Sequence, residues 1–233
     1  MLFNFLQTAA DMVEAVPVQE ELSFSLIDMA TKGGWLMIVL LVLSIVAIYI
    51  FGQKWWAIGQ AGKIDKNFIK DVDNYLMEGK VRSARALCKR SDTPIARMIE
   101  KGIERIDKPL ADIRISVENV ANVEVAKLEK GLPVLATIAG GAPMIGFLGT
   151  VMGMVQAFFN MSQAGNNIDI TLLSSGIYTA MITTVGGLIV GILAYFAYNF
   201  LTARVTSLVT KMEAISIEFL DAAQARKDAK NLE

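Results

Sequence analysis

Small and hydroxylated residues, clustered within long uncharged stretches, are the part of this chain with the clearest potential for chemistry. The uncharged stretches cover residues 33–53, 131–168 and 170–203. In the second stretch, small residues recur at spacings of four and three and so share one helix face: Ala139, Pro143, Gly146, Thr150, Gly153 and Ala157. The third stretch contains a comparable stripe: Ser175, Thr179, Thr183, Gly186 and Val190. Such faces let another helix approach closely, and their hydroxyls can hydrogen-bond water or orient an acid on a partner.

The chemistry open to these hydroxyls is limited. At ordinary pH a threonine hydroxyl cannot hold a proton in transit, so a proton relay needs a titratable group within the membrane. None of the three uncharged stretches contains a carboxylate, and the chain has no histidine. If the chain takes part in proton transfer, we expect the proton-binding group to come from another subunit.

A purely structural interpretation competes with the chemical one. Threonine hydroxyls in helices commonly bond back to carbonyls three or four residues earlier, and small residues serve close helix packing. The pairs Gly149/Gly153 and Gly187/Gly191 match the G-x-x-x-G packing motif. On this interpretation the chain is a passive membrane scaffold, and replacing its threonines by valine would leave proton-dependent work intact.

Membrane-spanning helices are the elements that position these residues. About 20 apolar residues cross the hydrocarbon core as a helix, and the chain is 54% hydrophobic with a mean hydropathy of +0.46. We expect transmembrane helices at 33–53, 131–161 and 172–201, with a polar turn at 162–171. The first is rich in leucine, isoleucine and valine, with tryptophans at both ends, and is predicted to face lipid.

The basic residues predict the orientation. All but one of the 22 lysines and arginines lie within 54–130 or in the tail at 202–233, so these segments are predicted to be cytoplasmic. The segment 1–32 and the loop 162–171 are then periplasmic. Residues 1–32 lack the basic start of a cleaved signal peptide, and their apolar residues recur at helical spacing. We expect an amphipathic helix on the outer membrane surface there.

The cytoplasmic segments are predicted to be helical. Gly79 and Pro94 divide a compact helical subdomain at 60–109. Beyond it, one apolar stripe leads toward the second span without a strong breaker, and we expect a long helix continuous with that span: Ile113, Val117, Ala121, Val125 and Leu128. A second stripe continues the third span: Val205, Leu208, Met212, Ile215, Phe219 and Ala222. The two stripes are predicted to pack against each other.

The composition argues against an enzyme. Without histidine there is no Ser-His-Asp or Cys-His arrangement, and the sequence has no phosphate-binding G-x-x-x-x-G-K-[ST] loop. The single cysteine, Cys88, cannot form a thiolate zinc site and is predicted to be a reduced structural thiol. No metal, cofactor or nucleic acid is expected. A secondary transporter would normally have more spans and an inverted repeat.

Three blocks near the small-residue faces resemble the MotA/TolQ/ExbB proton channel family, most closely its ExbB and TolQ branch. They are A-P-x-I-G-x-x-G-T-V-x-G at 142–153, G-I-x-x-A-x-x-x-T-x-x-G-L at 176–188, and Tyr198–Asn199. The three predicted spans and the large cytoplasmic loop match that branch too. The fold expected is an all-α integral membrane protein with three transmembrane helices and long cytoplasmic helical extensions.

The resemblance implies a function and partners. It implies a ring of subunits in the bacterial inner membrane, pentameric in the family, around the helices of an ExbD- or TolR-like one-span protein that carries a membrane aspartate. The ring would use the proton-motive force to drive a TonB- or TolA-like protein. An ExbB-like role in outer-membrane transport is favoured by the extended N-terminal segment, and a TolQ-like role in a Tol-Pal motor for envelope integrity is the alternative.

The resemblance also implies roles for individual residues. Thr150 and Thr184 correspond to family threonines that face the lumen of the ring. Many members carry a glutamate where this chain has Thr179, so a role of that carboxylate does not transfer. The remaining residues of the two faces are expected to serve helix packing or a secondary part of the lumen: Pro143, Gly146, Gly153, Ser175, Thr179, Thr183 and Gly187.

Overall fold

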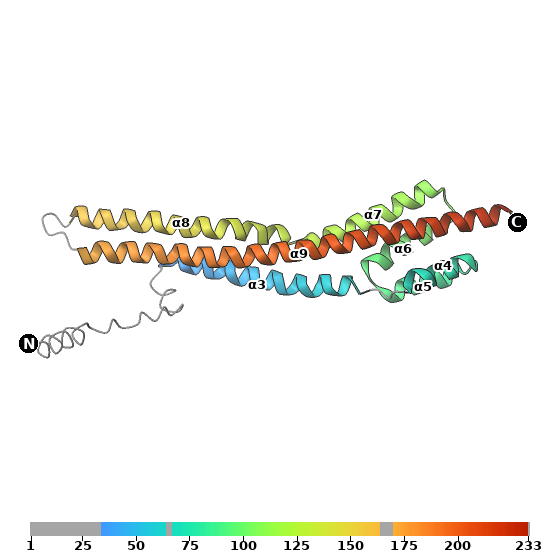
Figure 1. The fold of residues 1–233 in the computed structure, drawn as a ribbon, viewed down its shortest axis with the longest axis horizontal. Helices are drawn as coiled ribbons and strands as arrows, with labels where there is room; N and C mark the ends of the chain where they lie inside the picture. Colours follow the sequence, from blue (N-terminus) through green and yellow to red (C-terminus); the bar gives the residue numbers. More distant parts are fainter. Residues whose placement is uncertain (1–33, 64–66, 164–169, 233) are drawn as a thin grey trace, which may run out of the picture.

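The computed structural model describes residues 34–63, 67–163 and 170–232, and all of its regular elements are helices. The amphipathic helix expected within 1–32 and most of the turn expected at 162–171 lie outside the described residues. The molecule is elongated (Figure 1). Three long helices lie side by side at one end, and shorter helices surround the far part of the longest one at the other end.

Three helices are long and apolar enough to cross a membrane: α3 (Trp35–Ala61), α8 (Leu132–Gln163) and α9 (Ile170–Leu232). This confirms an all-helical protein with three apolar helices of membrane-spanning length. At about 1.5 Å per residue, the 63 residues of α9 extend roughly 95 Å, about three times the hydrocarbon thickness. The far part of α9 therefore lies outside the membrane, as the continuous stripe on this segment predicts.

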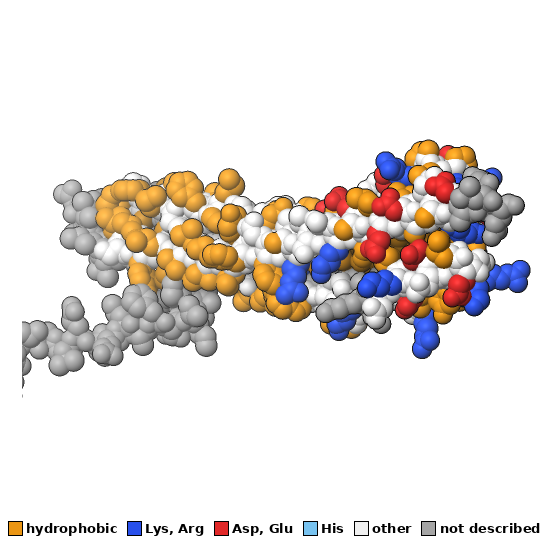
Figure 2. All heavy atoms as spheres, turned by 45° about the vertical axis from the view of Figure 1, so that its right-hand side comes forward, with side chains coloured by type: hydrophobic (Ala, Val, Ile, Leu, Met, Phe, Trp, Pro, Cys, Tyr) orange, Lys and Arg blue, Asp and Glu red, His pale blue; other side chains and the backbone are white. Residues whose placement is uncertain are grey.

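Charged side chains gather at the end away from the apolar helices (Figure 2). Here α4 (Phe68–Met77), α5 (Val81–Ser91), α6 (Pro94–Glu104) and α7 (Leu110–Glu129) pack with the part of α9 beyond Arg204. We call these elements the charged bundle. Its apolar core includes Val72, Leu76, Ile95, Ile99, Ile103, Ile113, Val117, Met212 and Phe219.

Local sequence signals account for the short helices of the charged bundle. Gly79 has a positive φ of 74° and follows the end of α4, where a residue with a side chain would be strained. Thr93 caps α6, because its hydroxyl accepts a hydrogen bond from the Ala96 amide at 3.2 Å. Pro94 occupies the first turn of α6, where its missing N–H costs nothing.

The long helix expected to run into the second span is interrupted. α7 ends at Glu129 and α8 begins at Leu132, because Gly131 adopts a positive φ of 96° and Lys130 an extended conformation with ψ of 120°. Only glycine reaches that φ without strain. The helix that carries the apolar stripe of 110–129 is thus joined to the second span by a two-residue turn.

The two apolar stripes of the charged bundle are predicted to pack on each other, but α6 lies between parts of them. A Cβ added to Gly102 of α6 would lie 2.3 Å from the Phe219 ring of α9 and 2.9 Å from Val117 of α7. α7 and α9 also contact each other directly. The prediction that the two stripes pack together is therefore confirmed, and the structure adds α6 as a third helix in the same core.

Candidate functional site

The small-residue faces of α8 and α9 meet in close backbone contact. A Cβ added to Gly146 would lie 2.8 Å from the Thr183 carbonyl oxygen, and one on Gly187 would lie 2.5 Å from the Ala142 carbonyl oxygen. Further along, a Cβ on Gly153 would lie 2.6 Å from the Ala180 side chain. Larger residues at these positions would push the helices apart, so the glycines set the spacing that positions the threonines.

A proline within α8 is covered by a glycine of α9. Pro143 has no N–H, so the Ala139 carbonyl lacks its usual helical donor. A Cβ on Gly191 would lie 2.6 Å from the Pro143 ring and 3.0 Å from the Ala139 oxygen. The backbone of α9 therefore packs directly against the point where the hydrogen-bond ladder of α8 is broken.

Two adjacent threonines of α9 reach the same carbonyl of α8. The Thr184 hydroxyl donates to the Gly146 oxygen at 2.9 Å and is half-buried. The Thr183 hydroxyl is buried; it bonds back to the Ala180 oxygen at 2.7 Å and lies 3.4 Å from the same Gly146 oxygen. Gly146 thus supplies an acceptor as well as space, because the absence of a side chain leaves its carbonyl within reach of α9.

Thr150 behaves differently from Thr184. Its hydroxyl donates to the Phe147 carbonyl on its own helix at 2.6 Å, and the residue is half-buried. This is the local back-bond expected of a helical threonine. The structure therefore gives the two threonines separate acceptors, one within α8 and one across the α8–α9 interface.

The stripe predicted on the third span is divided between two neighbours and the surface. Thr183 faces α8, whereas a Cβ on Gly186 would lie 3.1 Å from the Met37 sulfur of α3. Ser175 is exposed and Thr179 is half-exposed. The small residues of α9 thus accommodate both other spans at once.

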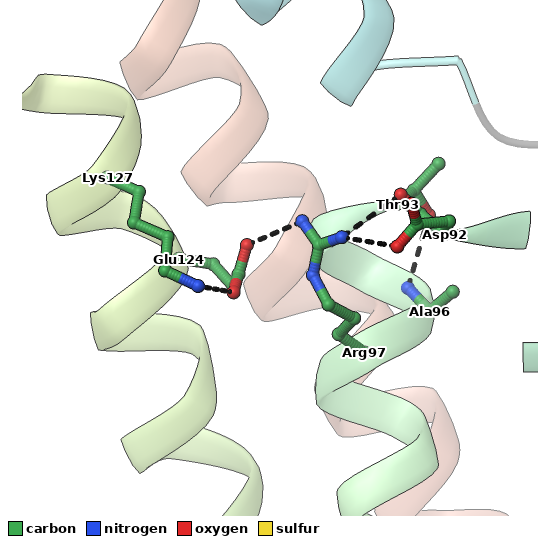
Figure 3. Close-up of polar contacts among 6 residues, drawn as sticks. All are labelled: Asp92, Thr93, Ala96, Arg97, Glu124 and Lys127. Atoms are coloured by element: carbon green, nitrogen blue, oxygen red, sulfur yellow. Dashed lines mark hydrogen bonds and ion pairs between the residues drawn. The ribbon is translucent and has the colours of Figure 1, made fainter. Parts of the chain in front are cut away.

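A cluster of charged side chains joins α6 to α7 in the charged bundle (Figure 3). Glu124 is only 5% exposed, and its two oxygens accept hydrogen bonds from Arg97 at 2.7 Å and Lys127 at 2.6 Å. Arg97 also donates to the Asp92 carboxylate at 2.6 Å. The Lys54 ammonium of α3 donates to the Lys127 backbone carbonyl at 3.0 Å, which connects the first span to the cluster.

The environment of Glu124 makes it a fixed charge. Burial raises the pKa of its carboxyl, but the hydrogen bonds from Arg97 and Lys127, with their positive charge, outweigh burial and lower the pKa below its ordinary value. Glu124 is therefore ionised at neutral pH, and its ion pair with Arg97 links α7 to α6. Glu124 is not among the residues predicted from the sequence, although its spacing of three from Ala121 and four from Leu128 places it within the apolar stripe.

The described residues offer little for metal or thiol chemistry. In these parts of the chain, no group of three or more His, Cys, Asp or Glu side chains is placed to hold a metal ion. Cys88 is buried, and desolvation raises the pKa of its thiol to about 12, with the charge of Glu100 adding to the effect. The thiol is protonated at neutral pH, and thiolate chemistry is unfavourable there.

The chain is similar to proteins named ExbB and TolQ. A protein named ExbB-like 1 from Synechocystis is 28% identical over 195 residues, which cover 83% of this chain and 77% of that protein. The Tol-Pal system protein TolQ of Haemophilus influenzae is 40% identical over 87 residues, 37% of this chain and 38% of TolQ. The biopolymer transport protein ExbB of Neisseria gonorrhoeae is 33% identical over 102 residues, 44% of this chain and 46% of that protein.

The family assignment covers the α8–α9 site itself. A model of the MotA/TolQ/ExbB proton channel family matches residues 90–214, which include all of α8, both threonines and the first two thirds of α9. The three apolar helices and the match over more than half of the chain agree. This chain therefore belongs to the MotA/TolQ/ExbB proton channel family.

Proposed function

We propose that the chain is an ExbB-like subunit of a motor in the bacterial inner membrane that uses the proton-motive force to energise outer-membrane transport. Five copies form a ring around the transmembrane helices of an ExbD-like partner, and the motor acts through a TonB-like protein. Membership of a proton channel family and similarity to proteins named for biopolymer transport support this proposal.

The hydrogen bond from Thr184 to the Gly146 carbonyl is the observation that carries the proposed mechanism. A hydroxyl has one donor and two acceptor lone pairs. Because the donor of Thr184 is committed to α8, its oxygen presents only lone pairs toward the lumen. Thr150 is in the same state through its bond to Phe147. Both hydroxyls therefore accept a hydrogen bond from the protonated aspartic acid of the partner and hold that side chain in place.

The other residues of the two faces support this lumen. Pro143, Gly146, Gly153 and Gly187 fix the distance between α8 and α9, as does the buried Thr183. Ser175 and Thr179 are more exposed and extend the hydroxyl-lined surface along α9. None of the three uncharged stretches contains a carboxylate or a histidine, so the proton moves on the partner's carboxylate.

The proposed orientation follows from charge. The segments 54–130 and 202–233 contain all but one of the basic residues and lie in the cytoplasm, and the segment before α3 and the turn between α8 and α9 lie in the periplasm. The whole ring is a multi-pass assembly of the inner membrane.

The double variant Thr150→Val, Thr184→Val tests the mechanism. Valine preserves shape and removes both acceptors, so we expect energy-dependent uptake across the outer membrane to be lost in cells that carry only this variant, while the ring still assembles. Thr→Ser at both positions should retain part of the uptake. Thr137→Val is the matched control, because Thr137 is exposed on α8 and its hydroxyl bonds back to the Pro133 carbonyl. Full uptake by the double variant would contradict the hydroxyl-lined lumen and favour a passive scaffold.

A TolQ-like subunit is the second candidate, favoured by the 40% identity to TolQ over 87 residues. In that case the same ring works with TolR- and TolA-like proteins to maintain envelope integrity. Deleting the gene distinguishes the two proposed functions. Loss of energy-dependent uptake supports the ExbB-like role, and detergent sensitivity with normal uptake supports the TolQ-like role.

A further inference from the structure

An apolar groove runs between α3 and α9 on the membrane-spanning part of the molecule. Its volume is about 490 Å³, and its walls are nearly all apolar; they include Ala47, Ile48, Phe51, Leu193, Phe196 and Ala197. The groove extends from Ser44 to Trp55 along α3, which is about 17 Å at 1.5 Å per residue. Half of a hydrocarbon core of about 30 Å is similar in length, so the groove spans one leaflet.

A cation lies at the end of the groove nearest the charged bundle. The Trp55 ring stacks on the Phe200 ring with centroids 4.8 Å apart and an interplanar angle of 10°. The Arg204 guanidinium carbon lies 5.2 Å from the centroid of each ring. Arg204 is exposed, and none of the ion pairs within the described residues involves it.

We propose that this groove binds an anionic phospholipid from the leaflet on the side of the charged bundle. One acyl chain lies between α3 and α9, and the phosphate is held by the guanidinium of Arg204. Arginine keeps its charge at all physiological pH values and matches phosphate oxygens with two parallel N–H donors. Trp55 places this end of the groove at the level of the headgroups, where indole rings concentrate. Basic pockets between transmembrane helices are suited to anionic headgroups.

Native mass spectrometry of the full-length protein in mild detergent tests the proposal. Phosphatidylglycerol and phosphatidylcholine with identical acyl chains are titrated separately. We expect phosphatidylglycerol to bind preferentially, and Arg204→Gln to weaken its binding about tenfold while leaving phosphatidylcholine unchanged. Lys211→Gln is the matched control, because Lys211 is an exposed cation on the same helix about two turns further from the groove. This control should bind both lipids as the parent protein does.

A second variant tests the acyl chain. Ala197→Leu fills the groove and should weaken binding of both lipids, with thermal melting used to confirm that the variant is folded. Equal binding of the two lipids, or equal effects of Arg204→Gln and Lys211→Gln, would overturn the role of Arg204. A further outcome would assign the groove to a second copy of the chain. Ala197→Cys would form disulfide-linked dimers across the groove, and these dimers would still bind as much phosphatidylglycerol as the parent protein, so the lipid would be bound elsewhere. None of these measurements depends on proton-driven uptake.

Discussion

At the scale of single residues, the sequence selects two hydroxyls as candidates for the lumen but does not show what they bond to. Thr150 and Thr184 are found through their motifs and spacing. The acceptor of Thr184 is a carbonyl 38 positions away, on another helix, and only the packing of α8 on α9 brings it within 2.9 Å. Local back-bonding is the general expectation for helical threonines, and it is correct for Thr150 alone of these two.

Glu124 shows the opposite situation, a buried charge within an apolar sequence pattern. Its partners come from α6 and from the next turn of α7. Replacing it by glutamine leaves Arg97 without its buried counter-charge, and we expect the charged bundle to lose about 2 kcal/mol of unfolding free energy. Thermal unfolding of the detergent-solubilised protein measures this. Glu118→Gln, on the same helix and exposed, is the control and should change stability little.

The lowered pKa of Glu124 also predicts a pH dependence. A carboxyl whose pKa is lower in the folded state stabilises the fold above its unfolded pKa, near 4.5, and loses that contribution as pH falls through the folded value. The contribution of Glu124 to the unfolding free energy should therefore be complete from pH 8 to about 5.5 and decline as the pH falls below about 4.5. Glu124→Gln should show a shallower fall over the acid range. Identical pH profiles would mean that Glu124 contributes nothing.

At the scale of elements, the sequence predicts well how far a helix continues where its apolar periodicity is unbroken. The stripe beyond the third span indicates a helix that leaves the membrane, and α9 is such a helix. The break between α7 and α8 is not predicted in this way. A glycine within a helical pattern lowers helix stability by only about 1 kcal/mol relative to alanine, so it does not by itself end a helix. Its positive φ is revealed only by the structure.

The α8–α9 interface makes a prediction at this scale. Gly187→Ala places a methyl group 2.5 Å from the backbone oxygen of Ala142, which cannot move without shifting α8. We expect the unfolding free energy in detergent to fall by about 1–3 kcal/mol, the usual cost of overpacking. Gly140→Ala on α8 is the matched control, because its Cβ would meet nothing within 4 Å. This control should be neutral or slightly stabilising, since alanine favours helix. Equal destabilisation by both variants would show that the close contact is unimportant.

At the scale of the whole molecule, a single copy buries little of the surface of its membrane-spanning helices. The membrane windows of α3, α8 and α9 are only 17%, 28% and 33% buried. Leucine, isoleucine and valine on α3 suit lipid, but α8 also exposes amides. Gln156 donates to Asn160 at 2.9 Å, and both are exposed. Polar groups facing hydrocarbon are unfavourable, so these side chains call for a neighbouring subunit or a lumen.

A closed ring meets this requirement, because it turns the polar and hydroxylated parts of α8 and α9 inward and leaves α3 in lipid. We expect native mass spectrometry after gentle detergent extraction to show a complex of about 127 kDa, five copies of the 25.4 kDa chain. A closed cyclic assembly has no free interface, so the mass distribution should be a single species and not a ladder. Gln156→Leu should leave the ring intact if that side chain faces the lumen, and destabilise it if the amide bonds a neighbouring subunit. A stable 25.4 kDa monomer under the same conditions would contradict the ring and, with it, the lumen in which Thr150 and Thr184 are proposed to act.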